Sequence, residues 1–212
     1  HLSYRQDTWA NTFSIGSYSK VMAKIKPIYG VVYMFEKDAI ITLLGSSGGV
    51  AKAVLSIFNK AAKDQNDPIH QIMRNARFHL IDLKQKDLTY FERIIPNLIE
   101  NVTFHEMNVN NIDLMKKHLI ESNTVIVVDV SRADSVEMLR CCNEFGVKYV
   151  NTALESEIVD GDESISSGFP LKERLRIFEE NKRKFKNTTA IIGSGMNPGI
   201  VQWMAIDLMN QF

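Results

Sequence analysis

The stretch that decides the fold spans residues 39–51 and reads Ala39-Ile40-Ile41-Thr42-Leu43-Leu44-Gly45-Ser46-Ser47-Gly48-Gly49-Val50-Ala51. Its first six residues form a nearly continuous apolar run, which is typical of a strand buried on both faces. Glycines then break the run, and apolar residues recur at helical spacing, at Val50, Val54, Ile57 and Phe58. The pattern therefore predicts a strand, a tight glycine turn and a helix in direct succession.

The glycine turn has the spacing Gly45-x-x-Gly48-x-x-Ala51, in the strand-to-helix context that gives such a motif its meaning. Gly45 would allow the tight turn, Gly48 would let a pyrophosphate approach the backbone, and Ala51 is small enough for close packing of helix on strand. Unpaired N–H groups and the positive end of the helix dipole bind anions at such a position. A strand-to-helix turn that is merely tight is the alternative. We expect a dinucleotide to contact Gly45, Ser46, Ser47, Gly48, Gly49 and Val50, with the two serines as hydroxyl donors.

The rest of the chain repeats the alternation of strand and helix. Further strands are expected near residues 78–83, 102–107, 124–130, 147–150 and 189–192. Helices are expected near residues 88–95, 112–120, 135–145, 171–185 and from about 198, with polar segments at 64–75 and 155–169. Six buried strands alternating with helices predict a doubly wound parallel α/β sheet of the Rossmann type, with strand order 3-2-1-4-5-6. Ligands of such sheets bind beyond the carboxyl ends of the strands, where the strand order reverses.

Composition and charge exclude several classes of partner. The chain has 212 residues, of which 45% are hydrophobic and 24% are charged, as is ordinary for a globular protein with a sizeable core. Its 25 basic residues balance 25 acidic ones, so no overall field favours nucleic acid or an anionic membrane. No apolar run reaches the length of a membrane span, and no export signal is visible. We therefore expect no nucleic-acid partner and no membrane partner.

The two cysteines, Cys141 and Cys142, are neighbours inside an apolar helical pattern. Such a pair suits buried thiols of a reduced protein better than a disulfide framework, so a cytoplasmic location is expected. Residues 1–38 are mixed in character and form an N-terminal extension to which no role is assigned. Residues 39–212 are expected to form the dinucleotide-binding domain, and a homo-oligomer is compatible with this organisation.

Asp82 ends the second predicted strand, where a carboxylate would accept hydrogen bonds from the adenosine ribose hydroxyls. An acidic side chain there favours NAD, because it would repel the 2′-phosphate of NADP. Lys84 and Lys86 lie just beyond and could accept that phosphate, so NADP stays open. A solvated carboxylate at a strand end is the alternative interpretation of Asp82.

Two further strand ends carry polar residues. Asp129 and Ser131 follow the apolar fourth strand, and a carboxylate there must be hydrogen-bonded or lie near the ligand. The alternative to cofactor contact is that Ser131 or Asp134 caps the next helix. Asn108, like Asn110, follows the third strand and could border the adenine or serve as a turn residue.

Asn197 lies in a glycine-rich bend after the last predicted strand, directly before Pro198. It would be held at the mouth of the cleft, although an asparagine that caps a helix starting with proline explains the same order without a ligand.

The histidines His70, His79, His105 and His118 show no metal-ligand spacing, and no Cys-x-x-Cys pair exists, so a zinc site is not expected. The chain is more typical of a cofactor platform than of a hydrolase.

Three segments resemble the saccharopine dehydrogenase-like family, and within it homospermidine synthase. They are the glycine turn of residues 44–51, the run Cys-Cys-Asn-Glu-Phe-Gly-Val-Lys-Tyr-Val-Asn-Thr of residues 141–152, and Gly-Met-Asn-Pro-Gly-Ile-Val of residues 195–201. The resemblance covers roughly residues 40–209. It implies a nicotinamide-dependent enzyme that oxidises a carbon–nitrogen bond of a secondary amine or polyamine, through an imine and hydride transfer.

The resemblance also implies roles for particular residues. Thr152 and Ala153 match the region that borders the nicotinamide, and Glu155 and Asn197 would lie near a cationic amine or amino-acid substrate as catalytic residues. Members of the family continue into a second α/β domain that supplies much of the substrate pocket, and we expect that domain to be absent from this chain. Two alternatives remain: a dinucleotide-sensing module without catalysis, and a short-chain reductase, against which it counts that no Tyr-x-x-x-Lys pair follows the fifth predicted strand.

Overall fold

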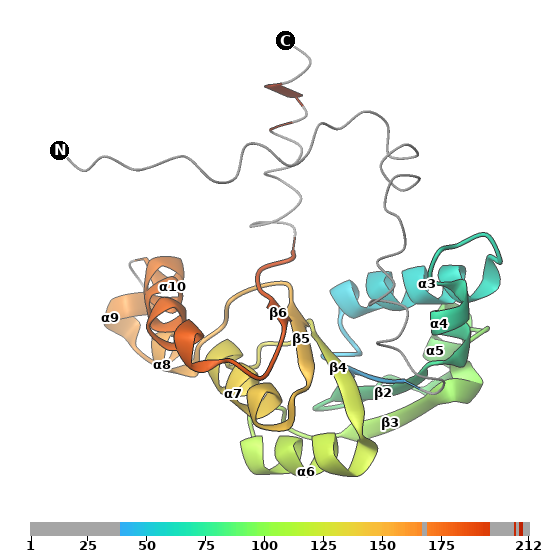
Figure 1. The fold of residues 1–212 in the computed structure, drawn as a ribbon, viewed down its shortest axis with the longest axis horizontal. Coiled ribbons are helices and arrows are strands. Elements are labelled where there is room, and N and C mark those ends of the chain that lie inside the picture. The colour runs from blue at the N-terminus through green and yellow to red at the C-terminus, as the bar shows by residue number, and fades with distance from the viewer. Residues whose placement is uncertain (1–38, 167–168, 196–205, 207, 210–212) are drawn as a thin grey trace. The chain divides into compact units, whose positions relative to one another are not determined.

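The computed structural model of the chain describes residues 39–166, 169–195, 206, 208 and 209, and these contain one parallel sheet. All strand pairs are parallel, and the strand order is β3-β2-β1-β4-β5-β6. The expected doubly wound sheet of order 3-2-1-4-5-6 is therefore confirmed (Figure 1). The strands are β1 (Ile40–Leu44), β2 (Arg77–Asp82), β3 (Val102–Glu106), β4 (Thr124–Asp129), β5 (Lys148–Asn151) and β6 (Ala190–Ile191).

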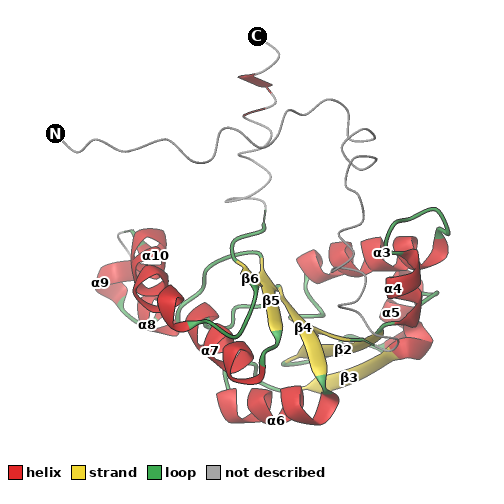
Figure 2. Ribbon diagram, in the orientation of Figure 1, coloured by secondary structure: helices red, strands yellow, loops and turns green. Residues whose placement is uncertain are grey.

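Helices cover both faces of the sheet (Figure 2). One face carries α3 (Gly49–Lys63), α4 (His70–Asn75) and α5 (Leu88–Ile94), and the other carries α6 (Ile112–Ser122) and α7 (Ser135–Phe145). After β5 come two single-turn helices, α8 (Glu157–Asp160) and α9 (Glu163–Ser166), and the longer α10 (Pro170–Asn181). Short 3₁₀ turns lie at Ile99–Asn101 and Lys182–Lys184.

Side-chain alternation along the strands divides the core between the two faces. Leu43 of β1 belongs to the cluster under α3, α4 and α5, whereas its neighbour Leu44 belongs to the cluster under α6 and α7. Both leucines are fully buried, as expected for a strand covered on both sides. The nearly continuous apolar run of residues 39–44 thus reflects burial on two faces.

Local capping residues set the helix boundaries. The carboxylate of Asp134 accepts hydrogen bonds from the backbone N–H groups of Val136 and Glu137, at 3.0 and 3.1 Å, so it caps α7. The same helix ends at Gly146, whose φ of +68° is the left-handed conformation that favours glycine. Of the two caps considered for this helix, Asp134 is the one observed, and the predicted end at Gly146 is confirmed.

The two polar segments noted in the sequence contain short helices. Residues 64–75 include α4, whose first residue, the buried His70, places its ring Nδ1 3.1 Å from the carbonyl of Ala61 in α3. Residues 155–169 include α8 and α9. The helix expected from about residue 198 lies outside the described residues. No described helix has the length and apolar character that a bilayer span requires.

Candidate functional site

The glycine turn lies between β1 and α3, at the carboxyl edge of the sheet where β1 separates β2 from β4. Gly45 has a φ of +78°, and a Cβ atom there would lie 2.9 Å from the Cα atom of Ser131. Its N–H donates to the carbonyl of Ile81 at 2.8 Å, while its own carbonyl accepts from Gly48 at 3.0 Å. The turn therefore needs glycine at position 45 for both its dihedral angle and its close approach to the loop after β4.

The N-terminus of α3 is open. Gly48 is its N-cap, no described side chain caps it, and the N–H groups of Gly49, Val50 and Ala51 donate to no described acceptor. Residues 48–50 are exposed, with Val50 at 52%. Unpaired N–H donors at the positive end of a helix attract anions, so binding of a phosphate at the start of this 15-residue helix stays a prediction that the geometry allows.

The two serines of the turn are engaged with the loop after β2. The buried hydroxyl of Ser46 donates to Oε1 of Gln85 at 3.0 Å, and the hydroxyl of Ser47 donates to the carbonyl of Lys84 at 3.2 Å. The amide nitrogen of Gln85 in turn donates to the carbonyl of Leu80 at 2.9 Å. In this arrangement an anion would be held by backbone N–H groups, and the serine hydroxyls as phosphate donors stay a prediction.

Asp82 faces the glycine turn from the end of β2. Its Oδ2 accepts the N–H of Ser47 at 2.9 Å, and its Oδ1 accepts the N–H of Leu83 at 2.8 Å. A carboxylate has about four acceptor positions, so both oxygens retain capacity for ribose hydroxyls. Lys84 and Lys86 nearby are exposed. The ribose contact of Asp82 therefore stays a prediction, now placed next to the open helix end.

Asp129 belongs to a buried hydrogen-bond network. Its Oδ1 accepts both the N–H and the hydroxyl of Ser131, at 2.9 and 2.6 Å, and its Oδ2 accepts the hydroxyl of Tyr149 at 2.7 Å. The Asp129 side chain is almost wholly buried, and burial raises the pKa of its carboxyl, although these three hydrogen bonds oppose the rise. The carboxylate thus stabilises the end of β4 from within, and its expected cofactor contact stays untested.

The network continues to β5 and β6 through Asn151. Its amide nitrogen donates to the hydroxyls of Ser135 and Tyr149, at 3.1 and 3.2 Å. Its amide oxygen accepts the N–H of Gly193 at 2.9 Å. These bonds fix the carboxyl ends of β4, β5 and β6 relative to one another.

Thr152 and Ala153 directly follow β5, and Thr152 is close to the segment after β6. A Cβ atom on Gly195 would lie 2.2 Å from the carbonyl oxygen of Thr152, so only glycine fits there. Asn197, two residues further on, lies outside the described residues. The expected role of Thr152 and Ala153 beside a nicotinamide stays a prediction.

Glu155 is paired with a cation of its own chain. Its Oε2 lies 3.1 Å from Nη1 of Arg174 in α10, and both side chains are about one-sixth exposed (16% and 17%). Arg174 also pairs with Asp160 and donates to the carbonyl of Leu154 at 3.1 Å. An amine substrate at Glu155 would therefore compete with Arg174 for the carboxylate.

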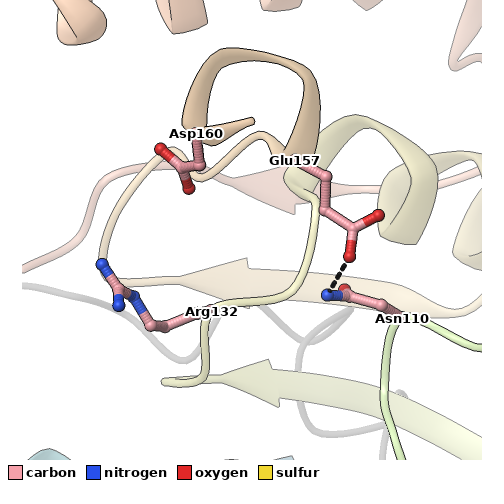
Figure 3. Close-up of a pocket in the computed structure, with 4 residues that line it drawn as sticks. All are labelled: Asn110, Arg132, Glu157 and Asp160. Carbon is pink, nitrogen blue, oxygen red and sulfur yellow. Dashed lines mark hydrogen bonds between the residues drawn. The ribbon is translucent and has the colours of Figure 1, made fainter. Parts of the chain in front are cut away.

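An open pocket lies beside these elements and is lined by Asn110, Arg132, Glu157 and Asp160 (Figure 3). The amide nitrogen of Asn110 donates to Oε1 of Glu157 at 2.6 Å, and its amide oxygen accepts the N–H of Asp134 at 3.1 Å. Asn108 accepts the N–H of Asn110 at 3.0 Å in a local turn. The turn role considered for Asn108 is thus observed, and its contact with adenine stays a prediction.

Sequence reasoning did not find one cluster that the fold assembles. His79, His105 and His118 offer ring nitrogens within 4.8 Å of one another, although they are far apart in the sequence. The available signal was weak: His79 and His105 are polar residues within neighbouring strands, and both are half-buried in the fold. Gln85, Tyr149 and Arg174 were also missed, and no pattern in the sequence marks them.

Comparisons with known proteins find structural likeness alone. No family model matches the chain, and no curated protein matches it. A UDP-glucose 4-epimerase of Bifidobacterium longum, solved with NAD+ and UDP, is 12% identical at a TM-score of 0.46, covering 73% of this chain and 52% of that one. A UDP-glucose 4-epimerase of Thermotoga maritima is 13% identical at a TM-score of 0.44, covering 72% and 54%.

A leucoanthocyanidin reductase of Vitis vinifera, solved with NADPH, is 14% identical at a TM-score of 0.43, covering 73% of this chain and 47% of that one. The chain spans about half the length of these solved structures. Likeness at such identities and TM-scores carries no conclusion about function, which depends instead on the geometry of the site.

Proposed function

We propose that this chain is the dinucleotide-binding domain of an NAD(P)-dependent oxidoreductase. The observation that carries the proposal is the open N-terminus of α3, which lies at the reversal of strand order between β1 and β4. Doubly wound sheets bind dinucleotides at this point, with the pyrophosphate against the helix N-terminus.

The residues around the helix end fit such a cofactor. The N–H groups of Gly49, Val50 and Ala51 would hold the pyrophosphate, and the carboxylate of Asp82 would accept the adenosine ribose hydroxyls. The hydrogen bonds between the loops after β1 and β2, and the close contact of Gly45 with the loop after β4, hold these loops in one arrangement. The protein would thereby orient the bound cofactor. When bound, the nicotinamide would accept or donate the hydride.

A substitution at Val50 separates binding from folding. Val50→Asp places a carboxylate in the first turn of α3. Its negative charge interacts favourably with the helix dipole and so stabilises the helix, but it repels a pyrophosphate. Ile57→Asp, at a similarly exposed position of the same helix, is the matched control, because it lies two turns from the site. We expect Val50→Asp to weaken NADH binding by roughly 10-fold or more, since a 1.4 kcal/mol repulsion suffices for that change.

Titration calorimetry with NAD+, NADH, NADP+, NADPH and ADP-ribose measures this directly. The proposal fails if the folded chain binds none of the five, or if Val50→Asp and Ile57→Asp bind equally well.

Selection between NAD and NADP is proposed to depend on the loop after β2. The carboxylate of Asp82 would favour NAD, so Asp82→Asn should shift the ratio of affinities toward NADPH, and Lys84→Gln should shift it toward NADH. If the ratio of NADH to NADPH affinity is the same in both variants as in the native chain, Asp82 and Lys84 do not select the cofactor.

The finer proposal is that the substrate is a secondary amine, a polyamine or an amino acid, oxidised through an imine by hydride transfer. Its support is the resemblance to the saccharopine dehydrogenase-like family and the partly buried carboxylate of Glu155. A rise in nicotinamide absorbance when the chain is mixed with NAD+ and putrescine, reduced in Glu155→Gln, is the expected result. Dinucleotide binding without any absorbance change would favour the sensing module instead. We also propose a cytoplasmic location, which the two free, buried cysteines support, and a homo-oligomer.

A further inference from the structure

Three histidines from separate elements meet on the face of the sheet that α6 covers. His79 lies on β2, His105 on β3 and His118 on α6, and one ring nitrogen of each lies within 4.8 Å of the other two. Their ring centroids are 4.8–5.2 Å apart, and all three residues are partly buried. The cluster is separate from the glycine turn, since α3 packs on the opposite face.

We propose that His79, His105 and His118 form a binding site for a divalent transition-metal cation of the zinc class. Three imidazole nitrogens would occupy three positions of a tetrahedral zinc and leave the fourth for water. Three histidines and one water are a common set of zinc ligands. Magnesium and calcium prefer oxygen ligands, and no carboxylate belongs to the cluster among the described residues.

The distances are close to those that a metal requires. Two ligands of a tetrahedral zinc at about 2.0–2.1 Å lie about 3.3 Å from each other. Nε2 of His105 and Nδ1 of His79 are 3.0 Å apart, so this pair needs to open by only a few tenths of an ångström. The third nitrogen, within 4.8 Å, must approach by about 1.5 Å or less, which a change in the side-chain torsion angles of that histidine can provide.

The protonation states also suit a metal. Burial lowers the pKa of all three rings, that of His118 to about 4, so neutral imidazoles with free lone pairs prevail at neutral pH. In the metal-free protein one of His79 and His105 donates its N–H to the other. Metal binding would move that proton to the other nitrogen of the same ring, a change of tautomer that releases no proton.

With Nδ1 of His118 as the ligand atom, polar groups next to the cluster can orient this ring through its Nε2 atom. The hydroxyl of Thr42 lies 3.4 Å from Nε2 of His118, and it shares a 2.7 Å hydrogen bond with Thr124, which in turn bonds Ser122 at 2.6 Å. A metal ligand is usually held by such an outer contact. A bound metal would join α6 to β2 and β3, and it should raise the melting temperature of the folded chain.

The test is a zinc titration against a fluorescent chelator, in a chain carrying His1→Gln so that this residue cannot compete. His79→Gln, His105→Gln and His118→Gln are compared with His70→Gln. His70 is the control because it is a buried histidine that lies outside the cluster, where its ring contacts the carbonyl of Ala61. We expect one zinc per chain and at least about 100-fold weaker binding in each cluster variant, since losses of outer-shell contacts alone cost 10–100-fold. The control should bind zinc as the His1→Gln chain does.

A second measurement needs no cluster variant and so covers the case in which those variants fail to fold. Zinc should shift the ring-nitrogen NMR signals of three histidines and leave that of His70 in place. The proposal is overturned if the His1→Gln chain does not bind one zinc, if cluster and control variants bind alike, or if the three shifted rings are not those of the cluster.

Discussion

Replacing Gly45 with alanine should destabilise the chain far more than replacing its neighbours in the same turn. The φ of +78° costs a residue with a Cβ atom about 1–2 kcal/mol. The new methyl group would also lie 2.9 Å from the Cα atom of Ser131 and 3.0 Å from the carbonyl oxygen of Val130. Both are backbone atoms that cannot rotate away, so overpacking adds roughly 1–3 kcal/mol. The free energy of unfolding should therefore fall by about 2–5 kcal/mol.

Gly49 and Gly48 are the matched controls. A Cβ atom on Gly49 meets nothing within 4 Å, so Gly49→Ala should leave stability unchanged or raise it by less than about 1 kcal/mol. A Cβ atom on Gly48 lies 3.2 Å from the carbonyl oxygen of Gly45, and Gly48→Ala should fall between the two. Neither residue has a positive φ.

Urea unfolding followed by far-ultraviolet circular dichroism measures the series. With a slope of about 2 kcal/mol/M, the midpoint for Gly45→Ala should fall by roughly 1–2.5 M at unchanged slope. A midpoint for Gly45→Ala equal to that for Gly49→Ala would refute the described geometry of the turn.

Three further predictions concern the buried groups. Burial raises the pKa of the Cys141 thiol to about 11 and that of Cys142 further, so neither should react with a disulfide reagent at about pH 8 until the chain is unfolded; rapid labelling of the folded chain would contradict this. Tyr149→Phe removes the 2.7 Å hydrogen bond to Asp129 and should lower the free energy of unfolding by about 1–3 kcal/mol in urea titrations, and a change near zero would show that the bond contributes nothing. Burial raises the pKa of Asp129 above 3.8, so as pH rises from about 4 the unfolded chain loses this proton before the folded chain does. The free energy of unfolding should therefore fall until the pH has passed the pKa of the folded state. The stability of Asp129→Asn relative to the native chain should rise over that interval, and a pH-independent difference would count against the shift.

The fold could be predicted because its strands carry unmistakable patterns. Residues such as Leu43 and Leu44 are adjacent yet both buried, and short apolar runs that recur between helical segments are typical of strands with helices on both faces. The glycine turn was equally readable, since Gly45 needs a positive φ and the next helix begins a few residues later. The short helices α4, α8 and α9 were not predicted, because one or two turns give too little periodicity and depend on tertiary contacts.

The side-chain partners in the site could not be predicted from the sequence. Gln85 meets Ser46 across 39 residues, and Tyr149 meets Asp129 across 20, because neighbouring loops and strands bring them together. The register of β2 against β3 likewise brings His79 to His105 without any local motif. Asp82 and Asp129 could be recognised as polar residues at strand ends, but their present hydrogen-bond partners depend on the packing of the whole edge.

The central claim is that the N-terminus of α3 binds the pyrophosphate of a dinucleotide. The most direct test is to titrate ADP-ribose into isotope-labelled chain and follow the backbone amide signals by NMR. The account predicts saturable shifts that are largest at Gly49, Val50 and Ala51, whose N–H groups donate to no described acceptor. Shifts confined to other parts of the chain, or none at saturating ligand, would contradict it.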